Sequence, residues 1–387
     1  MSKLDELEVL AKEVTASTIT ILPKRCSYIR NWNSKCKACM NACHHSAISR
    51  SIGHLDIDGE LCTNCGACAA ACPTSALLTS SPTQTDIVRA AKATAANYGG
   101  IAAFMCERDA KALDIDESRV TVIPCLNYLD EYLICGLLAT GIERVALLSR
   151  GCEGCNIDCD TPYFPAVVKS ARNLMKTWNT DGKVKIFHNI PENICNSGTL
   201  GRYVKSDKRE ALHQAGGSAM GYMVQSFDQA ISGKKAEKKV VERKQTIVKP
   251  EDVYPADTYR GPRIQRMLNR VGNLPSGASI ESRFWATVDI DPTKCHRCGC
   301  CSTMCATRAL SFTQDLPENP TRVQRKQAPG TLTFTPSLCM GCGLCQDSCF
   351  RNALIIGNRI PASYLDPDTV ITLFENEKQI TKSKFGF

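Results

Sequence analysis

The sequence is dominated by its cysteines, which account for 24 of its 387 residues. So many cysteines serve either disulfides or metal binding. Most of them stand in short runs with gaps of two or three residues, which gather several thiolates around one small inorganic centre. Disulfide-stapled domains are instead short chains bridged across longer loops. The spacing therefore favours metal binding, and a chain of this length has room for two or three domains.

Four such runs occur in two pairs, one pair near each end of the chain. Three runs have gaps of two, two and three residues, and the first is a variant with an opening gap of nine. The runs are Cys26-x9-Cys36-x2-Cys39-x3-Cys43, Cys62-x2-Cys65-x2-Cys68-x3-Cys72, Cys295-x2-Cys298-x2-Cys301-x3-Cys305 and Cys339-x2-Cys342-x2-Cys345-x3-Cys349. In bacterial ferredoxin runs the first three thiolates hold one [4Fe-4S] cluster and the fourth holds its neighbour.

This crossing predicts four [4Fe-4S] clusters in two modules. The expected ligand sets are Cys62, Cys65, Cys68 with Cys43; Cys26, Cys36, Cys39 with Cys72; Cys295, Cys298, Cys301 with Cys349; and Cys339, Cys342, Cys345 with Cys305. If Cys26 is not a ligand, its centre would hold three iron atoms. Zinc ribbons also pair C-x2-C motifs, but runs that end in a gap of three are uncommon there.

Both modules resemble the bacterial two-cluster ferredoxin family, which implies a βαββαβ fold around the clusters. The proline that usually follows the fourth cysteine is kept only as Pro73, and His44, Ala306 and Phe350 stand at the other three positions. We expect these changes to tune fit and potential rather than abolish binding. The predicted fold class is α+β with ferredoxin-like modules at both ends and a central α/β domain on a small parallel sheet.

The segment 83–190 alternates apolar strand patterns with helical patterns. We predict strands near 100–106, 120–125, 145–152 and 184–187, and helices at 86–98 and at 127–140, the latter opening at a capping Asn127 and closing at Gly141. Strands and helices in alternation predict a parallel sheet.

Three of these strands end in a cysteine, namely Cys106, Cys125 and Cys152. All three thiols are expected at the carboxyl edge of the sheet, where open α/β sheets bind ligands. Cys155 and Cys159 follow in a glycine-containing turn that lets backbone approach a bound group. A fifth cluster is therefore predicted, with Cys106, Cys125, Cys152 and Cys155 as the favoured ligands and Cys159 as the alternative.

The stretch IPCLNYLDEYLICGLLATGIERVALLSRGC resembles the delta, or iron-sulfur, subunit family of methyl-viologen-reducing hydrogenase. That resemblance implies a [2Fe-2S] centre and a relay of electrons between a redox enzyme and a flavoprotein such as the heterodisulfide reductase A subunit. The cysteines after Cys152 are this chain's own, so both [2Fe-2S] and [4Fe-4S] stay open.

The predicted domain organisation follows from these patterns. It comprises a dicluster module at 1–82, a hydrogenase delta-subunit-like α/β domain at 83–204, a basic extended connector at 205–284, a second dicluster module at 285–360 and a tail at 361–387. The connector has too few apolar residues for a core of its own. We interpret it as a strap across a partner subunit or across the other module, with a solvated loop as the alternative.

The formal net charge of +8 counts every cysteine as neutral. Four clusters held by thiolates would cancel about eight positive charges, so the basic residues need no nucleic acid. The N-terminus shows no export signal. The most apolar stretch, 133–148, is interrupted by Glu143 and Arg144. We expect a cytoplasmic protein with no membrane span, from an anaerobic host.

The sequence shows no dinucleotide fingerprint, no P-loop and no nucleophile with a plausible base. It therefore predicts a non-catalytic electron-transfer subunit. The expected partner is a hydrogenase, a molybdenum or tungsten enzyme, or a heterodisulfide reductase-like flavoprotein, with electrons passed on to a flavoprotein, ferredoxin or second enzyme. One alternative is a disulfide reductase centred on Cys152, Cys155 and Cys159, and another is a redox sensor. Cys135, Cys195 and Cys300 are not expected to be ligands.

Overall fold

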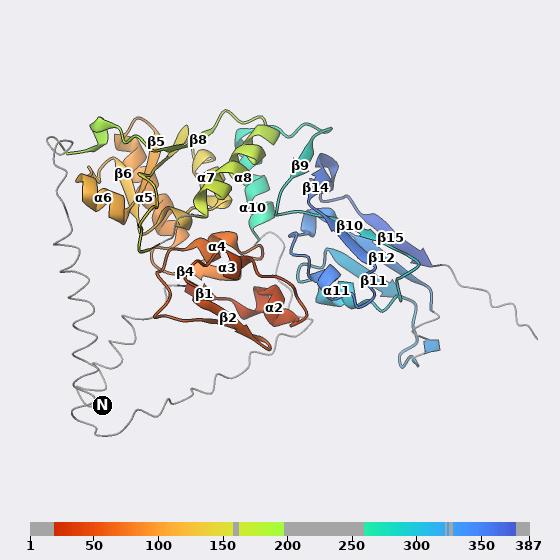
Figure 1. Ribbon diagram of the computed structural model, residues 1–387. Helices are drawn as coiled ribbons and strands as arrows, with labels where there is room; N and C mark the ends of the chain where they lie inside the picture. Colours follow the sequence, from red (N-terminus) through yellow and green to blue (C-terminus); the bar gives the residue numbers. More distant parts are fainter. Residues whose placement is uncertain (1–18, 158–161, 197–258, 322, 325–327, 377–387) are drawn as a thin grey trace, which may run out of the picture.

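The computed structural model describes residues 19–157, 162–196, 259–321, 323–324 and 328–376 (Figure 1). Cys159, residues 205–258 of the predicted connector and the end of the tail therefore lie outside the described residues. Within the described residues no helix is both long enough and apolar enough to cross a membrane.

The N-terminal module consists of short strands and helices in the order strand, helices, strand, strand, helix, strand. The elements are β1 (Ile19–Ile21), η1 (Pro23–Arg25), α2 (Ser27–Arg30), α3 (Ala38–Asn41), β2 (Ile48–Ser51), β3 (His54–Ile57), α4 (Ala67–Ala71) and β4 (Leu77–Thr79). β1 pairs antiparallel with β4, and β2 pairs antiparallel with β3. The helices that carry cysteines are only four or five residues long, so their geometry depends on tertiary contacts.

The C-terminal module repeats this order. Its elements are β10 (Thr287–Ile290), α11 (Cys300–Met304), β11 (Leu310–Gln314), β12 (Gly330–Phe334), η5 (Pro336–Leu338), α13 (Leu344–Asp347), β13 (Leu354–Gly357), η6 (Ala362–Leu365) and β15 (Ile371–Asn376). β10 pairs antiparallel with β13, while β12 lies between β11 and β15. The final strand β15, which falls in the predicted tail, is thus part of this module's sheet.

The central domain contains the small parallel sheet that the sequence predicts. Its elements are α5 (Gln84–Asn97), β5 (Ile101–Cys106), α6 (Glu107–Leu113), β6 (Val120–Ile123), η2 (Leu126–Tyr128), α7 (Glu131–Leu138), β7 (Arg144–Leu148), α8 (Phe164–Thr177), β8 (Lys183–Phe187) and η3 (Glu192–Ile194). The four strands lie in the order β6-β5-β7-β8, all parallel. The prediction of a parallel sheet is confirmed.

One helix start differs from the prediction. α7 begins after Asp130, whose carboxylate accepts a hydrogen bond from Leu133 N (2.8 Å), so Asn127 is not the cap. Asn127 is buried and accepts instead from Phe164 N (2.8 Å), which fixes the start of α8. Both residue types are good N-caps, and tertiary contacts decide between them. The helix still closes before Gly141, which has φ +93°.

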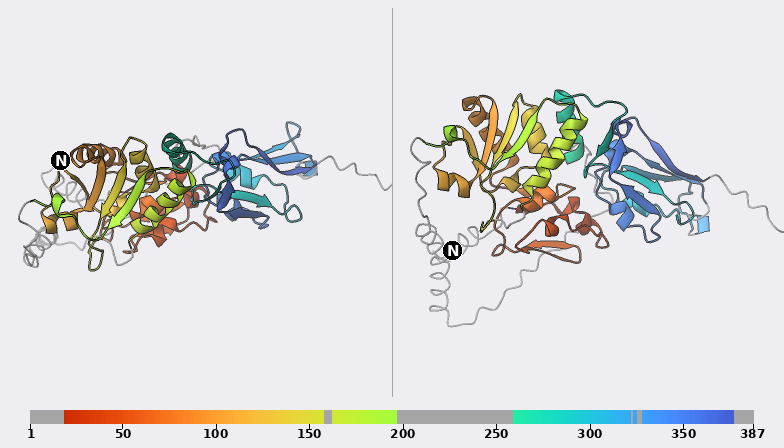
Figure 2. Two further views of the ribbon diagram at one scale, coloured as in Figure 1. Left: turned by 90° about the horizontal axis from the view of Figure 1, so that it is seen from above. Right: turned by 45° about the horizontal axis from the view of Figure 1, so that its top comes forward.

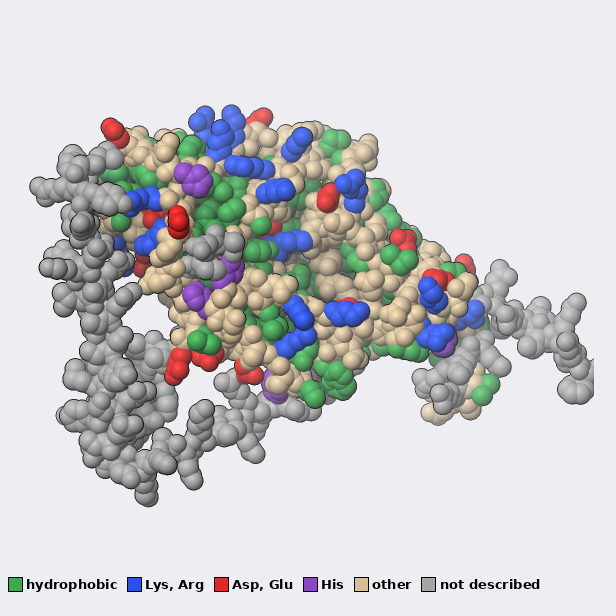
Figure 3. All heavy atoms as spheres, viewed as in Figure 1, with side chains coloured by type: hydrophobic (Ala, Val, Ile, Leu, Met, Phe, Trp, Pro, Cys, Tyr) green, Lys and Arg blue, Asp and Glu red, His purple; other side chains and the backbone are tan. Residues whose placement is uncertain are grey.

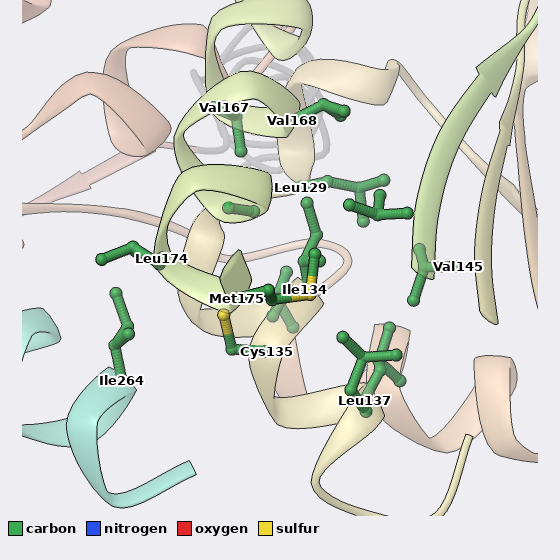
Figure 4. Close-up of a cluster of buried hydrophobic side chains, with 14 of the residues drawn as sticks. Leu129, Ile134, Cys135, Leu137, Val145, Val167, Val168, Leu174, Met175 and Ile264 are labelled. Atoms are coloured by element: carbon green, nitrogen blue, oxygen red, sulfur yellow. The ribbon is translucent and has the colours of Figure 1, made fainter. Parts of the chain in front are cut away.

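The described end of the predicted connector is helical rather than extended. α10 (Arg260–Val271) packs against α7, and β9 (Ser279–Glu281) pairs antiparallel with β14 (Arg359–Pro361). Ile264 and Leu268, one helical turn apart, are fully buried in the core of the central domain. Figure 4 shows Ile264 facing Leu174 on α8. The helix buries this narrow apolar stripe and leaves its polar residues for other contacts.

The three units lie side by side, with α10 where they meet. In Figure 1 and in the right view of Figure 2 the N-terminal module lies beneath the parallel sheet and its helices, and the C-terminal module lies to one side, beyond α10. α10 thus contacts the central domain and the N-terminal module, and the chain passes from it into the C-terminal module.

Candidate metal centres

The first predicted ligand set of the N-terminal module lines one cavity. Cys26, Cys36, Cys39 and Cys72 all face it, together with apolar residues such as Leu77. Burial raises the pKa of the Cys26 thiol to about 11 and that of Cys39 to about 12, and the neighbouring thiols of this set add to both shifts. Cys26, the ligand after the long gap, is therefore placed with the other three.

The second set of this module also comes together. Burial raises the pKa of the Cys68 thiol well above its ordinary value, and Cys65, Cys62 and Cys43 each add to the shift because they are close. Cys43 follows α3, whereas the other three precede or lie in α4. The fourth cysteine of each run is thus paired with the other run, as the crossing requires.

The C-terminal module shows the same exchange. Cys295, Cys298, Cys301 and Cys349 line one cavity, and burial raises the pKa of Cys301 to about 12. We call this group the outer C-terminal set, since Cys298 is exposed.

The other group of this module consists of Cys339, Cys342, Cys345 and Cys305. Burial raises the pKa of the Cys345 thiol well above its ordinary value, and the other three thiols add to that shift. We call it the inner C-terminal set.

Backbone N–H groups point at sulfur in equivalent places of the two modules. Ala76 N donates to Cys72 Sγ (3.2 Å), and Ala353 N donates to Cys349 Sγ (3.3 Å). Each bond joins the fourth cysteine of a run to the residue four positions later. Hydrogen bonds to cluster sulfurs are one means by which a protein sets a reduction potential.

The four favoured cysteines of the central domain line one cavity. Cys106 ends β5, Cys125 follows β6, and Cys152 and Cys155 lie in the loop after β7. The strand order places β5 between β6 and β7, so three neighbouring strand ends contribute thiols at the carboxyl edge of the sheet. Cys159, the alternative ligand, lies outside the described residues.

A buried carboxylate holds the loop that carries Cys152. Asp109, 2% exposed, accepts from the Arg108 guanidinium (3.0 Å) and from Arg150 N (2.9 Å), and Arg108 also donates to the Gly151 carbonyl. The loop is therefore fixed to the start of α6 by charge-assisted hydrogen bonds.

Three other cysteines occupy different surroundings. Cys135 is fully buried in α7, close to Ile134 and Met175 in Figure 4, and Cys195 forms an isolated bridge with Ile115. Cys300 does face the cavity of the outer C-terminal set, but its thiol points to the Ser348 carbonyl (3.7 Å). Within the described residues no three or more His, Cys, Asp or Glu side chains are arranged to hold a single metal ion.

Cys300 and Cys301 provide a direct comparison of a neighbour with a predicted ligand. Replacing Cys301 by alanine should remove one of the four thiolates and lower the iron content, by about one atom if a three-iron centre remains and by about four if the whole centre is lost. Cys300→Ala should leave the iron content unchanged, because the other four thiols of this cavity remain. Iron analysis of both anaerobically purified variants checks this, and equal iron loss in the two would mean that Cys300 is also a ligand.

Side chains and backbone of the two modules meet in a small polar contact. Asn31 Nδ2 donates to Ser348 Oγ (2.8 Å), Lys35 N donates to Asp347 Oδ2 (2.8 Å), and Ser34 Oγ lies 3.4 Å from the same carboxylate oxygen. These residues precede Cys36 on one side and Cys349 on the other. The contact therefore holds two cysteine-bearing segments together.

Thiols of the two modules also lie close to each other at this contact. Burial raises the pKa of the Cys342 thiol to about 11, and Cys36 of the other module adds to the shift. The Ser27 hydroxyl, only 3% exposed, is near enough to lower that pKa, although its geometry falls short of a regular hydrogen bond. The inner C-terminal set thus adjoins the set of Cys26, Cys36, Cys39 and Cys72.

The N-terminal module meets the central cavity through the loop after Cys155. The Ile157 carbonyl accepts from Thr63 Oγ1 and lies 3.3 Å from His45 Nε2, while Ile157 itself lines the central cavity. Thr63 follows the ligand Cys62 directly. This carbonyl therefore links the set of Cys62, Cys65, Cys68 and Cys43 to the central set.

Gly66 makes the close approach of α4 to η2 possible. It has φ +80°, and a Cβ at this position would lie 2.7 Å from the Tyr128 ring. Only glycine combines this left-handed backbone with so little space. Gly66 lies between Cys65 and Cys68, so the cysteine run and the segment after Cys125 pack directly on each other.

Two arginines, which the sequence does not single out, bind the helix that carries Cys68. Arg260, 5% exposed, donates to the carbonyls of Ala69 (3.0 Å), Ala70 (2.9 Å) and Cys72 (3.1 Å) and forms an ion pair with the buried Asp130 (3.1 Å). The last carbonyls of so short a helix accept few hydrogen bonds from within the helix, and Arg260 supplies charged donors to them.

Arg283 acts in parallel with Arg260. It donates to the Ala70 (2.7 Å) and Ala71 (3.0 Å) carbonyls and forms a two-point ion pair with Glu131 (3.1 and 2.7 Å). Burial alone would lower the pKa of Arg283, but the Glu131 carboxylate and its hydrogen bonds outweigh this and raise it. The signal in the sequence is the pair Asp130 and Glu131 at the start of an otherwise apolar helix, which needs buried cations.

Comparison with known protein families matches two parts of this chain. A 4Fe-4S dicluster domain model matches residues 34–76, and a 4Fe-4S binding domain model matches residues 332–355. No curated protein and no solved structure matches the chain. The chain therefore has iron-sulfur, ferredoxin-type 4Fe-4S domains near both ends, which indicates 4Fe-4S cluster binding and a role in electron transport.

Proposed function

We propose that the chain is a multi-cluster electron-transfer subunit with four [4Fe-4S] clusters in its two modules and a fifth cluster in the central domain. The observation that carries the proposal is the grouping of twenty cysteines into five sets of four. The thiolate donors fit iron-sulfur clusters, which require four such ligands each. When bound, each cluster accepts and releases one electron at a time.

The contacts between the sets support a continuous relay. The outer C-terminal set adjoins the inner one through the crossed cysteines of one module, and the inner set adjoins the N-terminal module at Cys342 and Cys36. The N-terminal module in turn meets the central cavity at Ile157. We infer an order in which the outer C-terminal set and the central set are the two ends.

The chain's own residues serve this relay by holding the cysteine ligands in place and by burying part of the surface of their thiols. Burial raises the pKa of many of these thiols, so they are protonated near neutral pH and release protons when iron binds. Backbone N–H groups directed at Cys72 and Cys349 stabilise negative charge on sulfur.

The central domain is the part of the chain that we propose contacts a catalytic partner. Its cavity lies at the carboxyl edge of the parallel sheet, and its sequence resembles the hydrogenase delta-subunit family. We propose that the fifth cluster, [2Fe-2S] or [4Fe-4S], exchanges electrons with a catalytic subunit. A hydrogenase, a molybdenum or tungsten enzyme and a heterodisulfide reductase-like flavoprotein are the candidate partners.

The first test is iron and acid-labile sulfide per chain in anaerobically purified protein, with low-temperature EPR after reduction by dithionite. Four [4Fe-4S] clusters require about 16 iron atoms, and a fifth centre raises this to about 18 or 20. A value of about 16 would leave the central domain empty and favour the disulfide reductase alternative. Bound zinc with little iron would contradict the proposal as a whole.

A further inference from the structure

The outer C-terminal set, at one end of the proposed relay, has a ligand that is exposed to solvent. Among the cysteines that the structure describes, Cys298 stands alone in being exposed. Cys339, Cys342 and Cys345 of the neighbouring inner set are only partly exposed, and burial raises the pKa of each of these thiols. Among the described ligands, the outer C-terminal set therefore offers the most exposed thiol to a separate protein.

The residues around Cys298 combine an aromatic side chain with positive charge. Phe350 is 69% exposed, and its ring meets the edge of the exposed His296 at 5.9 Å between centroids. Aromatic side chains are enriched at protein–protein interfaces, so Phe350 can supply an apolar contact to a partner. We define the Cys298 face as His296, Arg297, Cys298, Phe350 and Arg351.

The charged side chains of the Cys298 face are those of Arg297 and Arg351, and both are positive. Arg297 lies with its guanidinium 4.9 Å from the centre of the Phe374 ring, and Arg351 is exposed. None of the described residues that line the cavity here is acidic. Figure 3 shows Lys, Arg and His side chains close together at the end of the molecule formed by the C-terminal module, with a few Asp or Glu side chains beside them.

Two carboxylates of the C-terminal module, those of Asp347 and Asp291, have hydrogen-bond or ion-pair partners of their own. Asp347 accepts from Lys35 N and Ser34 Oγ at the contact between the modules, and Asp291 forms an ion pair with Lys294 (3.0 Å). The ion pair with Lys294 offsets the charge of Asp291. Asp347 keeps its charge, because its donors are neutral, but the two arginines of the Cys298 face outnumber it. Positive potential around an exposed redox ligand attracts a negatively charged partner and raises the rate of encounter.

We propose that the Cys298 face docks a small acidic one-electron carrier protein, which exchanges electrons with the relay at this end. The proposal rests on the proposed function, since it needs a cluster at Cys295, Cys298, Cys301 and Cys349. In the exchange the carrier loses one electron and the chain gains one, or the reverse, and no bond forms or breaks. Phe350 supplies an apolar contact, while Arg297 and Arg351 orient the carrier.

The test is stopped-flow reduction of the anaerobic, iron-loaded full chain by a small acidic ferredoxin that has been reduced beforehand. At low ionic strength the second-order rate constant should fall at least about threefold in Arg351→Glu, and added salt should slow the wild type in the same way. The matched control is Arg144→Glu, an exposed arginine at the start of β7, at the edge of the sheet opposite its cysteines. Its rate should equal that of the wild type.

A second variant, Arg297→Gln, removes the other positive charge of the face and should also lower the rate constant, which guards against a local effect of one substitution. Iron content and EPR spectra are recorded for every sample. Equal rates in Arg351→Glu and Arg144→Glu, or a rate that does not respond to salt, would overturn the docking proposal. So would a ferredoxin that fails to reduce a chain which dithionite reduces. In each of these cases intact cluster signals would leave the proposed relay standing, whereas missing iron would contradict the relay itself.

Discussion

Replacement of Arg260 by methionine should destabilise the folded chain by about 3–5 kcal/mol, because a buried charge loses its partner. Asp130 is 2% exposed and would keep its carboxylate without the cation 3.1 Å away. The carbonyls of Ala69, Ala70 and Cys72 would lose their hydrogen bonds from Arg260 at the same time, although Arg283 would still donate to the Ala70 carbonyl. Thermal unfolding of the anaerobic full chain, followed by circular dichroism and by loss of cluster absorbance, measures the effect.

Two controls separate the loss of this charge pair from ordinary surface effects. Arg359→Met removes an ion pair with Glu281 of even shorter distance (2.7 Å), but both partners are exposed, and a loss of about 1 kcal/mol or less is expected. Adding Asp130→Asn to Arg260→Met should restore part of the stability, because the asparagine can still cap α7. A double variant as unstable as the sum of its parts would show that the unpaired charge is not the cause.

Arg260 also illustrates which features the sequence could not provide. Its neighbours Ile264 and Leu268 form an apolar stripe, but the surrounding arginines make the segment resemble a solvated connector. The carboxylates that accept these arginines, Asp130 and Glu131, lie far away in the sequence. A helix whose polar residues are satisfied by another domain cannot be recognised from its local composition.

The cysteine spacing was more informative because its constraint is local. In a run such as that from Cys62 to Cys72, short gaps alone place the first three thiols around one centre, and the fourth follows one helical turn later. The parallel sheet was predictable for a similar reason, since buried strands alternate with helices. The start of α7 was not, because Asn127 and Asp130 are both good caps and the contact with Phe164 determines the outcome.

The second large effect is expected in the central domain, where Cys125→Ala should abolish the fifth centre. Cys125 is 6% exposed and lines the same cavity as Cys106, Cys152 and Cys155, so three thiolates would remain where four are needed. Iron should fall by about four atoms per chain for a [4Fe-4S] centre or about two for a [2Fe-2S] centre. The remaining thiols, Cys152 and Cys155 included, should then become reactive to an alkylating reagent.

Cys135→Ala is the matched control for this experiment. Cys135 is another buried cysteine of the same domain, but it lies within the core of α7, so the variant should lose some stability and keep all of its iron. If Cys125→Ala keeps the wild-type iron content, and Cys152 and Cys155 react equally in both proteins, the central thiols hold no cluster. The redox chemistry of this domain would then be that of a dithiol, and the relay would end in the N-terminal module. Loss of iron in Cys125→Ala alone extends the relay to the edge of the parallel sheet.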